Sequence, residues 1–172
     1  GLVGGPKGYL PGPGARLYGL PYGAATSVLA YRRDVFAQHG LKPPRTYTEL
    51  QALLLPLRDK TGMGALTSRG QTGHNCVHAW LLHLNPLCRH VFDAACNPTF
   101  QAEPGIKALQ LLYEIAATGP EGVPTFTFND MLNAFLEGRS AMYLDSTAVF
   151  GAVRSSSQSR VDGKVAYALH PK

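Results

Sequence analysis

The sequence predicts a single α/β domain in which short strands alternate with helices. Two observations carry this prediction. Apolar runs of strand length are separated by segments with helical periodicity, and several of those runs end in polar residues. Strands separated by helices are typical of a sheet covered by helices. With 172 residues, 45% of them hydrophobic, the chain can bury one core and one domain is the natural expectation.

The first elements follow a segment rich in glycine and proline. Residues 1–16 are expected to form a loop or tail, because these residues punctuate regular structure. Strands are predicted at Leu17–Pro21 and Ser27–Tyr31. The second strand leads into a helix at Asp34–His39, which Gly40 ends.

A capping box predicts the next helix. Thr46 and Glu49 precede a set of leucines that recur on one helical face. Pro56 lies inside this pattern and is expected to kink the helix or end it early. A strand at Met63–Thr67 and a helix at Asn75–Leu84 follow, with a polar turn between them.

The remaining elements continue the alternation. Pro104 suits the first turn of a helix whose apolar positions continue to Gly119. A short helix is predicted from Asn129 to Gly138, with the asparagine as its cap. A last strand is predicted at Val165–Leu169.

The charge pattern argues against nucleic acid as a partner. The net charge is +5, but Arg32 and Arg33 form the only adjacent basic pair, and the other basic residues are scattered among acidic and apolar ones. This distribution indicates a solvated, mildly basic surface. Neither a membrane-spanning apolar stretch nor a leader segment is recognisable, so we expect a soluble, mature or trimmed piece.

The cysteines and histidines give little indication of a disulfide framework or a metal site. Three cysteines are few for a disulfide scaffold and lack zinc-site spacing. Cys88 and Cys96 flank a predicted turn, so two alternatives stay open: a disulfide between them, or two small buried thiols. Cys76 is left over either way and is expected to be a buried thiol. His74 and His78 share a helical face, but no carboxylate accompanies them, so we expect neither a native metal site nor a cofactor.

Polar residues follow several of the apolar runs. Asp145 closes the run Ala141–Leu144, and the segments 21–23 (PYG) and 68–70 (SRG) follow other runs. In α/β sheets, ligands bind beyond the ends of strands. We therefore expect these three polar ends to face one cleft.

Each candidate in these segments has a structural alternative. Arg69 on the surface would form an ion pair with an acidic residue, and Asp145 would cap the following helix. Asn129 fits a helix cap as well as a ligand contact. Tyr143 either packs in the core or faces the cleft, and Tyr22 is the stronger candidate for ligand contact.

Several short motifs occur in a characteristic order from about residue 16 to residue 172. They are residues 17–23 (LYGLPYG), 28–36 (VLAYRRDVF), 40–44 (GLKPP), 46–50 (TYTEL) and 135–142 (FLEGRSAM). In this order and spacing they resemble the extracellular solute-binding proteins (family 1) of carbohydrate ABC importers. The resemblance implies one lobe of a periplasmic-binding-protein-like (type II) fold, with a mixed sheet flanked by helices.

The resemblance also implies a domain organisation. Members of the family have two α/β lobes joined by hinge strands, and the ligand is trapped between the lobes. Residues 17–172 match one ligand-binding lobe, with hinge-side segments near 17–22 and 167–172. Both chain ends are therefore expected on one side of the domain.

Within the family, the chain is most similar to the branch that binds sugar alcohols such as sorbitol and mannitol. The similarity lies in residues 68–70, 75, 128–129 and 142–147. The chain departs from the branch at Gly73 and His74, where an aromatic residue and an acid are usual, and at Tyr143, where tryptophan is usual. The ligand-binding residues that follow from this similarity are Tyr22, Arg69, Asn75, Asn129, Tyr143 and Asp145.

These residue types suit a polyol. A carboxylate accepts hydroxyl protons and a guanidinium fork donates to two oxygens, so Asp145 and Arg69 match neighbouring hydroxyls. The asparagine amides both donate and accept, and aromatic rings can cover the C–H face of the ligand.

The resemblance predicts substrate capture for an ABC importer. The partners are a sugar alcohol or small sugar and, through the full-length protein, an ABC permease; the location is periplasmic or extracellular, with a membrane anchor as an option. No enzyme is expected, because nucleophile-elbow, P-loop, dinucleotide and HExxH motifs are missing. Two alternatives stay open: a carbohydrate-active hydrolase domain using Asp145 with Glu137, and a ligand-free interaction module on the same fold.

Overall fold

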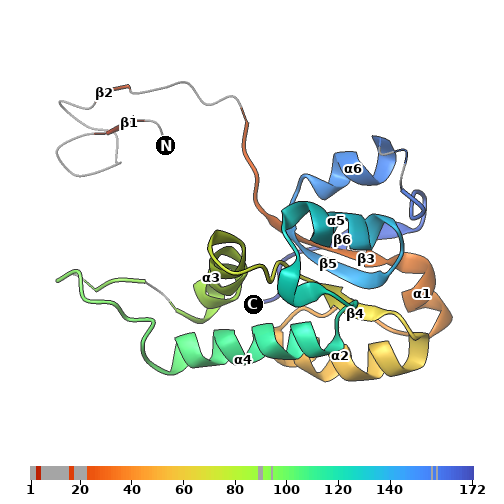
Figure 1. The fold of residues 1–172 in the computed structure, drawn as a ribbon, viewed down its shortest axis with the longest axis horizontal. Helices are drawn as coiled ribbons and strands as arrows, with labels where there is room; N and C mark the ends of the chain where they lie inside the picture. The colour runs from red at the N-terminus through yellow and green to blue at the C-terminus, as the bar shows by residue number, and fades with distance from the viewer. Residues whose placement is uncertain are drawn as a thin grey trace.

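The computed structural model (Figure 1) describes residues 3–4, 16–17, 23–88, 91–93, 95–155, 157 and 159–172. Two short strands, β1 (Val3–Gly4) and β2 (Arg16–Leu17), pair antiparallel. Tyr22 and all of the predicted strand at 17–21 except its first residue lie outside the described residues. Nearly all of the predicted loop at residues 1–16 does so too.

A four-stranded mixed sheet organises the domain. Its strands are β3 (Ser27–Arg32), β4 (Gly64–Thr67), β5 (Ser140–Ser146) and β6 (Val165–Ala168), in the order β4-β5-β3-β6. Strands β4 and β5 are parallel, whereas β3 is antiparallel to both of its neighbours, β5 and β6. The predicted mixed α/β architecture is confirmed.

Helices cover both faces of this sheet, as Figure 1 shows. They are α1 (Arg33–Gln38), α2 (Tyr47–Thr61), α3 (His74–Leu87), α4 (Glu103–Thr118), the 3-10 turn η1 (Val123–Thr125), α5 (Phe128–Leu136) and α6 (Val149–Ser155). The bounds of α1, α4 and α5 agree with the predicted helices within about two residues, and α3 continues three residues beyond the predicted end. Among the described residues, none of the helices is long and apolar enough to cross a bilayer.

Two apolar cores lie on opposite faces of the sheet. One joins α1, α2 and α4 to the sheet through residues that include Leu29, Leu50, Leu54, Ile115, Met142 and Leu144. The other joins α5 and α6 to the sheet through residues that include Val28, Ala30, Phe135, Tyr143 and Val153. Strand β5 is therefore buried on both faces, which is why its central residues 141–144 form an unbroken apolar run.

The start of α2 is capped by half of the predicted capping box. The Thr46 hydroxyl accepts a hydrogen bond from the Glu49 N–H at 3.1 Å. The Glu49 carboxylate, however, accepts from the Arg45 N–H at 2.7 Å rather than from Thr46. The carboxylate therefore fixes the chain one residue before the cap.

Pro56 does not end α2, which continues to Thr61. The proline has no N–H to donate to the carbonyl of Ala52, a loss that normally disfavours a helix interior. Leu54 and Leu57 on either side are fully or almost fully buried against the sheet. Their burial holds the helix together beyond the proline, and the expectation of an early end is wrong.

Helix α5 begins with a capping box, although the sequence indicated Asn129 alone as its cap. Thr127 is the cap: its hydroxyl accepts from the Asp130 N–H at 3.3 Å, and the Asp130 carboxylate accepts from the Thr127 N–H at 2.9 Å. Asn129 lies exposed in the first turn. Its predicted role as a helix cap is therefore wrong.

The cysteines are not joined by the bridge that the sequence left open. Cys88 is buried at the end of α3 with its Sγ 3.2 Å from the Thr99 hydroxyl, whereas Cys96 is exposed. Cys76 is half-buried within α3. Among the described residues, the three cysteines are present as thiols.

Candidate functional site

Arg69 and Asp145 lie at the same edge of the sheet because their strands run parallel. Thr67 at the end of β4 pairs with Tyr143 in β5, so the loop after β4 begins level with the end of β5. Asp145 is still part of β5, which ends at Ser146. The carboxyl ends of two parallel strands thus converge, as the sequence predicted for the segments that carry these two residues.

The two side chains form a buried ion pair. Arg69 donates from Nε to Asp145 Oδ2 at 2.8 Å and from Nη2 to Oδ1 at 2.7 Å. The Asp145 side chain is 2% exposed and that of Arg69 is 12% exposed. The guanidinium also lies 4.7 Å above the ring centroid of Phe128, at the start of α5. The fork geometry and the burial fix both groups in one orientation.

Part of the pair's bonding capacity is left for another molecule. A carboxylate has about four acceptor positions, and Asp145 uses two for Arg69 and one for the Ser146 N–H, at 2.6 Å. Within the described part of the chain, no hydrogen bond from Arg69 Nη1 is found. The site therefore offers donor hydrogens beside one remaining acceptor position, a combination that suits hydroxyl groups.

The two asparagines lie on neighbouring segments of this edge. Asn75, in the first turn of α3, is buried and donates from Nδ2 to Gln71 Oε1 at 3.0 Å. The Phe126 carbonyl accepts from the N–H groups of Gly70 and Gln71, at 3.0 and 3.1 Å, and ties the loop after β4 to the start of α5. Asn129 is exposed near that start. Neither asparagine is hydrogen-bonded to the ion pair in the described structure.

Tyr143 occupies the core, one of the two positions that the sequence left open. Its side chain is fully buried and its ring lies 5.8 Å from that of Phe135. The hydroxyl donates to the Ser146 carbonyl at 3.1 Å, and burial raises the pKa of the phenol. Tyr143 therefore supports the strand end from beneath instead of facing a ligand.

His78 is a neighbour of the ion pair that the sequence analysis considered only for metal binding. Its Nδ1 lies 3.8 Å from Asp145 Oδ2, and its side chain is 48% exposed. Because α3 follows the β4 loop directly, helical spacing brings His78 back over the strand ends. Among the described residues, no group of three or more potential ligands can hold a metal ion.

The carboxylate pair of the hydrolase alternative is not assembled. Glu137 follows α5 and accepts from Arg139 Nε at 2.8 Å. Asp145 lies at the far end of β5, beyond the whole length of that strand. Two carboxylates must flank one glycosidic bond for hydrolysis, so this pair does not provide that chemistry.

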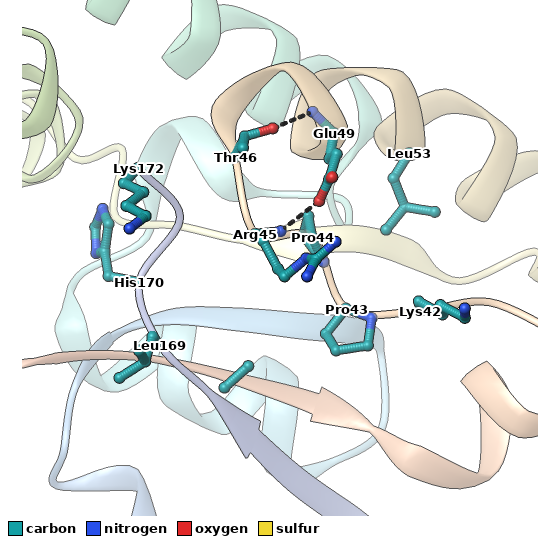
Figure 2. Close-up of a pocket in the computed structure, with 11 residues that line it drawn as sticks. Lys42, Pro43, Pro44, Arg45, Thr46, Glu49, Leu53, Leu169, His170 and Lys172 are labelled. Carbon is teal, nitrogen blue, oxygen red and sulfur yellow. Dashed lines mark hydrogen bonds between the residues drawn. The ribbon is translucent and has the colours of Figure 1, made fainter.

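A hollow of the described surface lies elsewhere, as Figure 2 shows. It has a volume of about 1070 Å³ and lies between the loop before α2 and the segment after β6. Its walls are apolar, with cationic side chains at Lys42, Arg45 and Lys172. It contains no residue that the sequence analysis proposed for ligand binding.

A buried hydrogen-bonded chain fixes one wall of this hollow. The Tyr47 hydroxyl lies 2.7 Å from His170 Nε2 and 3.3 Å from His83 Nδ1. Burial lowers the pKa of His83 to about 3, with a further contribution from nearby His170, and burial also lowers the pKa of His170. Main-chain bonds between Lys172 and residues 45–47 complete the attachment of the last residues to α2.

The mixed sheet and its two helical layers give the chain the α/β fold of periplasmic-binding-protein-like solute-binding proteins. The chain belongs to the family of bacterial extracellular solute-binding proteins, whose sequence model matches residues 2–172. This is a family of binding proteins, in agreement with the expectation that the chain is not an enzyme.

Individual relatives show what kind of protein this chain is similar to. The chain is 31% identical to the mannitol-binding protein of Pseudomonas aeruginosa and 26% identical to a probable amino-acid ABC transporter periplasmic-binding protein of Sinorhizobium fredii, in each case over 91% of this chain and 37% of the relative. A crystal structure of an ABC transporter solute-binding protein from Agrobacterium vitis with bound D-mannitol matches 94% of this chain and 40% of that protein, with 26% identity and a TM-score of 0.78. The chain spans about two fifths of the length of these relatives.

Proposed function

We propose that the chain forms one lobe of a two-lobed solute-binding protein that captures a polyol or small sugar for an ABC importer. The observation that carries this proposal is the buried Arg69–Asp145 pair at the carboxyl ends of β4 and β5. The family membership and the mannitol-binding relatives support it. The site captures its ligand without chemical conversion.

The ion pair is better suited to a neutral polyol than to a charged ligand. Each partner neutralises the other, so the site has no net charge with which to attract an ion. An amino acid would need the Arg69 fork for its carboxylate, and Asp145 already occupies that fork. A hydroxyl group can instead use Nη1 and the remaining carboxylate position without breaking the pair.

The other contacts in the proposal come from neighbouring segments and from the second lobe. Asn129 is exposed and free to bind a hydroxyl, and Asn75 is available if it exchanges its bond to Gln71. Tyr22 remains a proposed contact for the C–H face of the ligand. The second lobe would supply the opposite wall, with hinge-side segments near 17–22 and 167–172.

The proposal places the protein outside the cytoplasmic membrane, in keeping with its extracellular family. Closure of the two lobes on the ligand would create the surface that a membrane permease recognises. A membrane anchor elsewhere in the full-length protein is compatible with this role.

Thermal-shift screening of a full-length, two-lobed protein tests the proposal. The ligands are sorbitol, mannitol, arabitol, common hexoses and a set of amino acids. A ligand at one hundred times its dissociation constant stabilises the folded state by about 2.7 kcal/mol, so a polyol is expected to raise Tm by several degrees. A shift with amino acids alone would overturn the proposal, and no shift with any ligand would leave only the family and the fold.

A further inference from the structure

We propose that His78 and Asp145 hold the same ligand hydroxyl, so that His78 forms a third side of the site and selects hydroxyl groups. This inference rests on the proposed function, because it concerns the same polyol site. It starts from the 3.8 Å separation between His78 Nδ1 and Asp145 Oδ2.

The separation is too long for a direct hydrogen bond. N–H···O bonds have donor–acceptor distances of about 2.7–3.2 Å, so the imidazole and the carboxylate leave a gap. For an oxygen atom about 2.8 Å from both groups, the angle Nδ1···O···Oδ2 at that oxygen would be about 85°. A hydroxyl group accommodates such an angle, because its O–H bond and its lone pairs point in different directions.

The other contacts of Asp145 direct its free acceptor position to a ligand. Arg69 and the Ser146 N–H occupy three of its positions and hold the carboxylate still. The aspartate is almost fully buried, whereas half of the His78 side chain is accessible. A ligand can therefore approach past His78 and reach the carboxylate there.

The chemistry of this gap discriminates between functional groups. We assign the proton of His78 to Nδ1, so that the bridging atom donates a proton to the Asp145 carboxylate and accepts one from the His78 N–H. A hydroxyl does both. An ammonium group cannot accept, an ether oxygen cannot donate, and a carboxylate would be repelled by Asp145. The arrangement thus gives a physical reason for a preference for polyols over amino acids.

The test measures D-mannitol binding to the full-length, two-lobed protein by NMR titration, with the Ser146 amide beside the site as the reporter. His78→Leu removes the donor and is expected to raise the dissociation constant five- to tenfold, the cost of about one hydrogen bond. His78→Gln keeps a donor amide and should stay within threefold of the unsubstituted chain. His74→Leu is the matched control on the same helical face and should bind unchanged.

A double-mutant cycle with monodeoxy analogues of mannitol locates the bridging hydroxyl. For one analogue, the His78→Leu effect should vanish, because the ligand no longer carries the group that His78 contacts. If His78→Leu binds mannitol as tightly as the unsubstituted chain, the inference fails while the proposed function stands. If the unsubstituted two-lobed protein binds none of mannitol, sorbitol and arabitol, the proposed function and the inference both fail.

Discussion

Asp145 accepts hydrogen bonds from a guanidinium fork and from the next main-chain N–H while almost no part of it touches water. A charge in such a place costs several kcal/mol of hydration, which only good geometry and full pairing offset. The pair therefore contributes less to stability than its short distances suggest. Its value lies in the fixed orientation of both groups at the strand end.

Substitutions of the pair should reveal this balance. Asp145→Asn leaves the Arg69 charge without its partner and is expected to lower the free energy of unfolding by about 3 kcal/mol. Arg69→Met should have a similar effect, because it strands the buried carboxylate. The double variant Arg69→Met/Asp145→Leu should recover most of the loss. Urea unfolding of the three variants measures these values, and additive losses in the double variant would contradict the interpretation.

The direct pairing of Arg69 with Asp145 was not predictable from the sequence. The two residues are far apart in the chain, and only the parallel register of β4 with β5 brings them together. The same limit applies to Tyr143: a strand buried on both faces has no apolar–polar alternation to show which side faces a ligand. The sequence did predict that polar residues follow the strands, and Arg69 and Asp145 do lie together at the ends of β4 and β5.

At the scale of single elements, local signals predicted helices well and their ends less well. The pattern of leucines in α2 indicated the helix, but the rule for proline could not anticipate how strongly Leu54 and Leu57 are buried. In α5, two residues suited to capping lie close together, and the structure uses Thr127 rather than Asn129. Periodicity reports burial over a whole helix, whereas caps depend on single main-chain angles.

The cap of α5 can be tested with a matched pair of variants. Thr127→Ala removes the acceptor for the Asp130 N–H and is expected to lower the free energy of unfolding by about 1 kcal/mol. Asn129→Ala, in the exposed first turn, should change it by less than about 0.5 kcal/mol. Thermal unfolding monitored by circular dichroism measures both. Equal losses would indicate that the asparagine also contributes to the cap.

The attachment of the last residues to α2 should make stability depend on pH. The pKa of His83 is about 3 in the folded state, below the usual value of about 6.5. The contribution of neutral His83 to the free energy of unfolding is therefore complete above pH 6.5 and is lost as the pH falls towards 3. Between pH 7 and pH 5 the free energy of unfolding should fall by about 2 kcal/mol from His83, and the lowered pKa of His170 acts in the same direction.

Urea unfolding across this pH range measures the effect. His83→Gln should flatten the profile between pH 7 and pH 5, although the variant will be less stable at neutral pH. His74→Gln, at an exposed position, should leave the profile unchanged. A flat profile for the unsubstituted chain would show that protonation of the buried imidazole is not coupled to unfolding.

At the scale of the whole molecule, the two helical layers meet on the central strands β5 and β3. Strand β5 lies between β4 and β3 in the sheet and contributes to both apolar cores. Its carboxyl end carries Asp145, so the candidate site is built on the most enclosed part of the domain. The outer residues of the candidate site are His78, from the second turn of α3, and Asn129, from the first turn of α5.

This enclosure has a consequence for exchange of amide protons with deuterated water. Opening β5 would require both layers to separate, so its main-chain amides should be among the slowest to take up deuterium, at a rate set by global unfolding. The loops after β4 and before α5 should exchange much sooner. A ligand bound at Asp145 would then slow amide exchange in the loops. It would leave the exchange of the strand unchanged, because the strand is already as well protected as the domain allows.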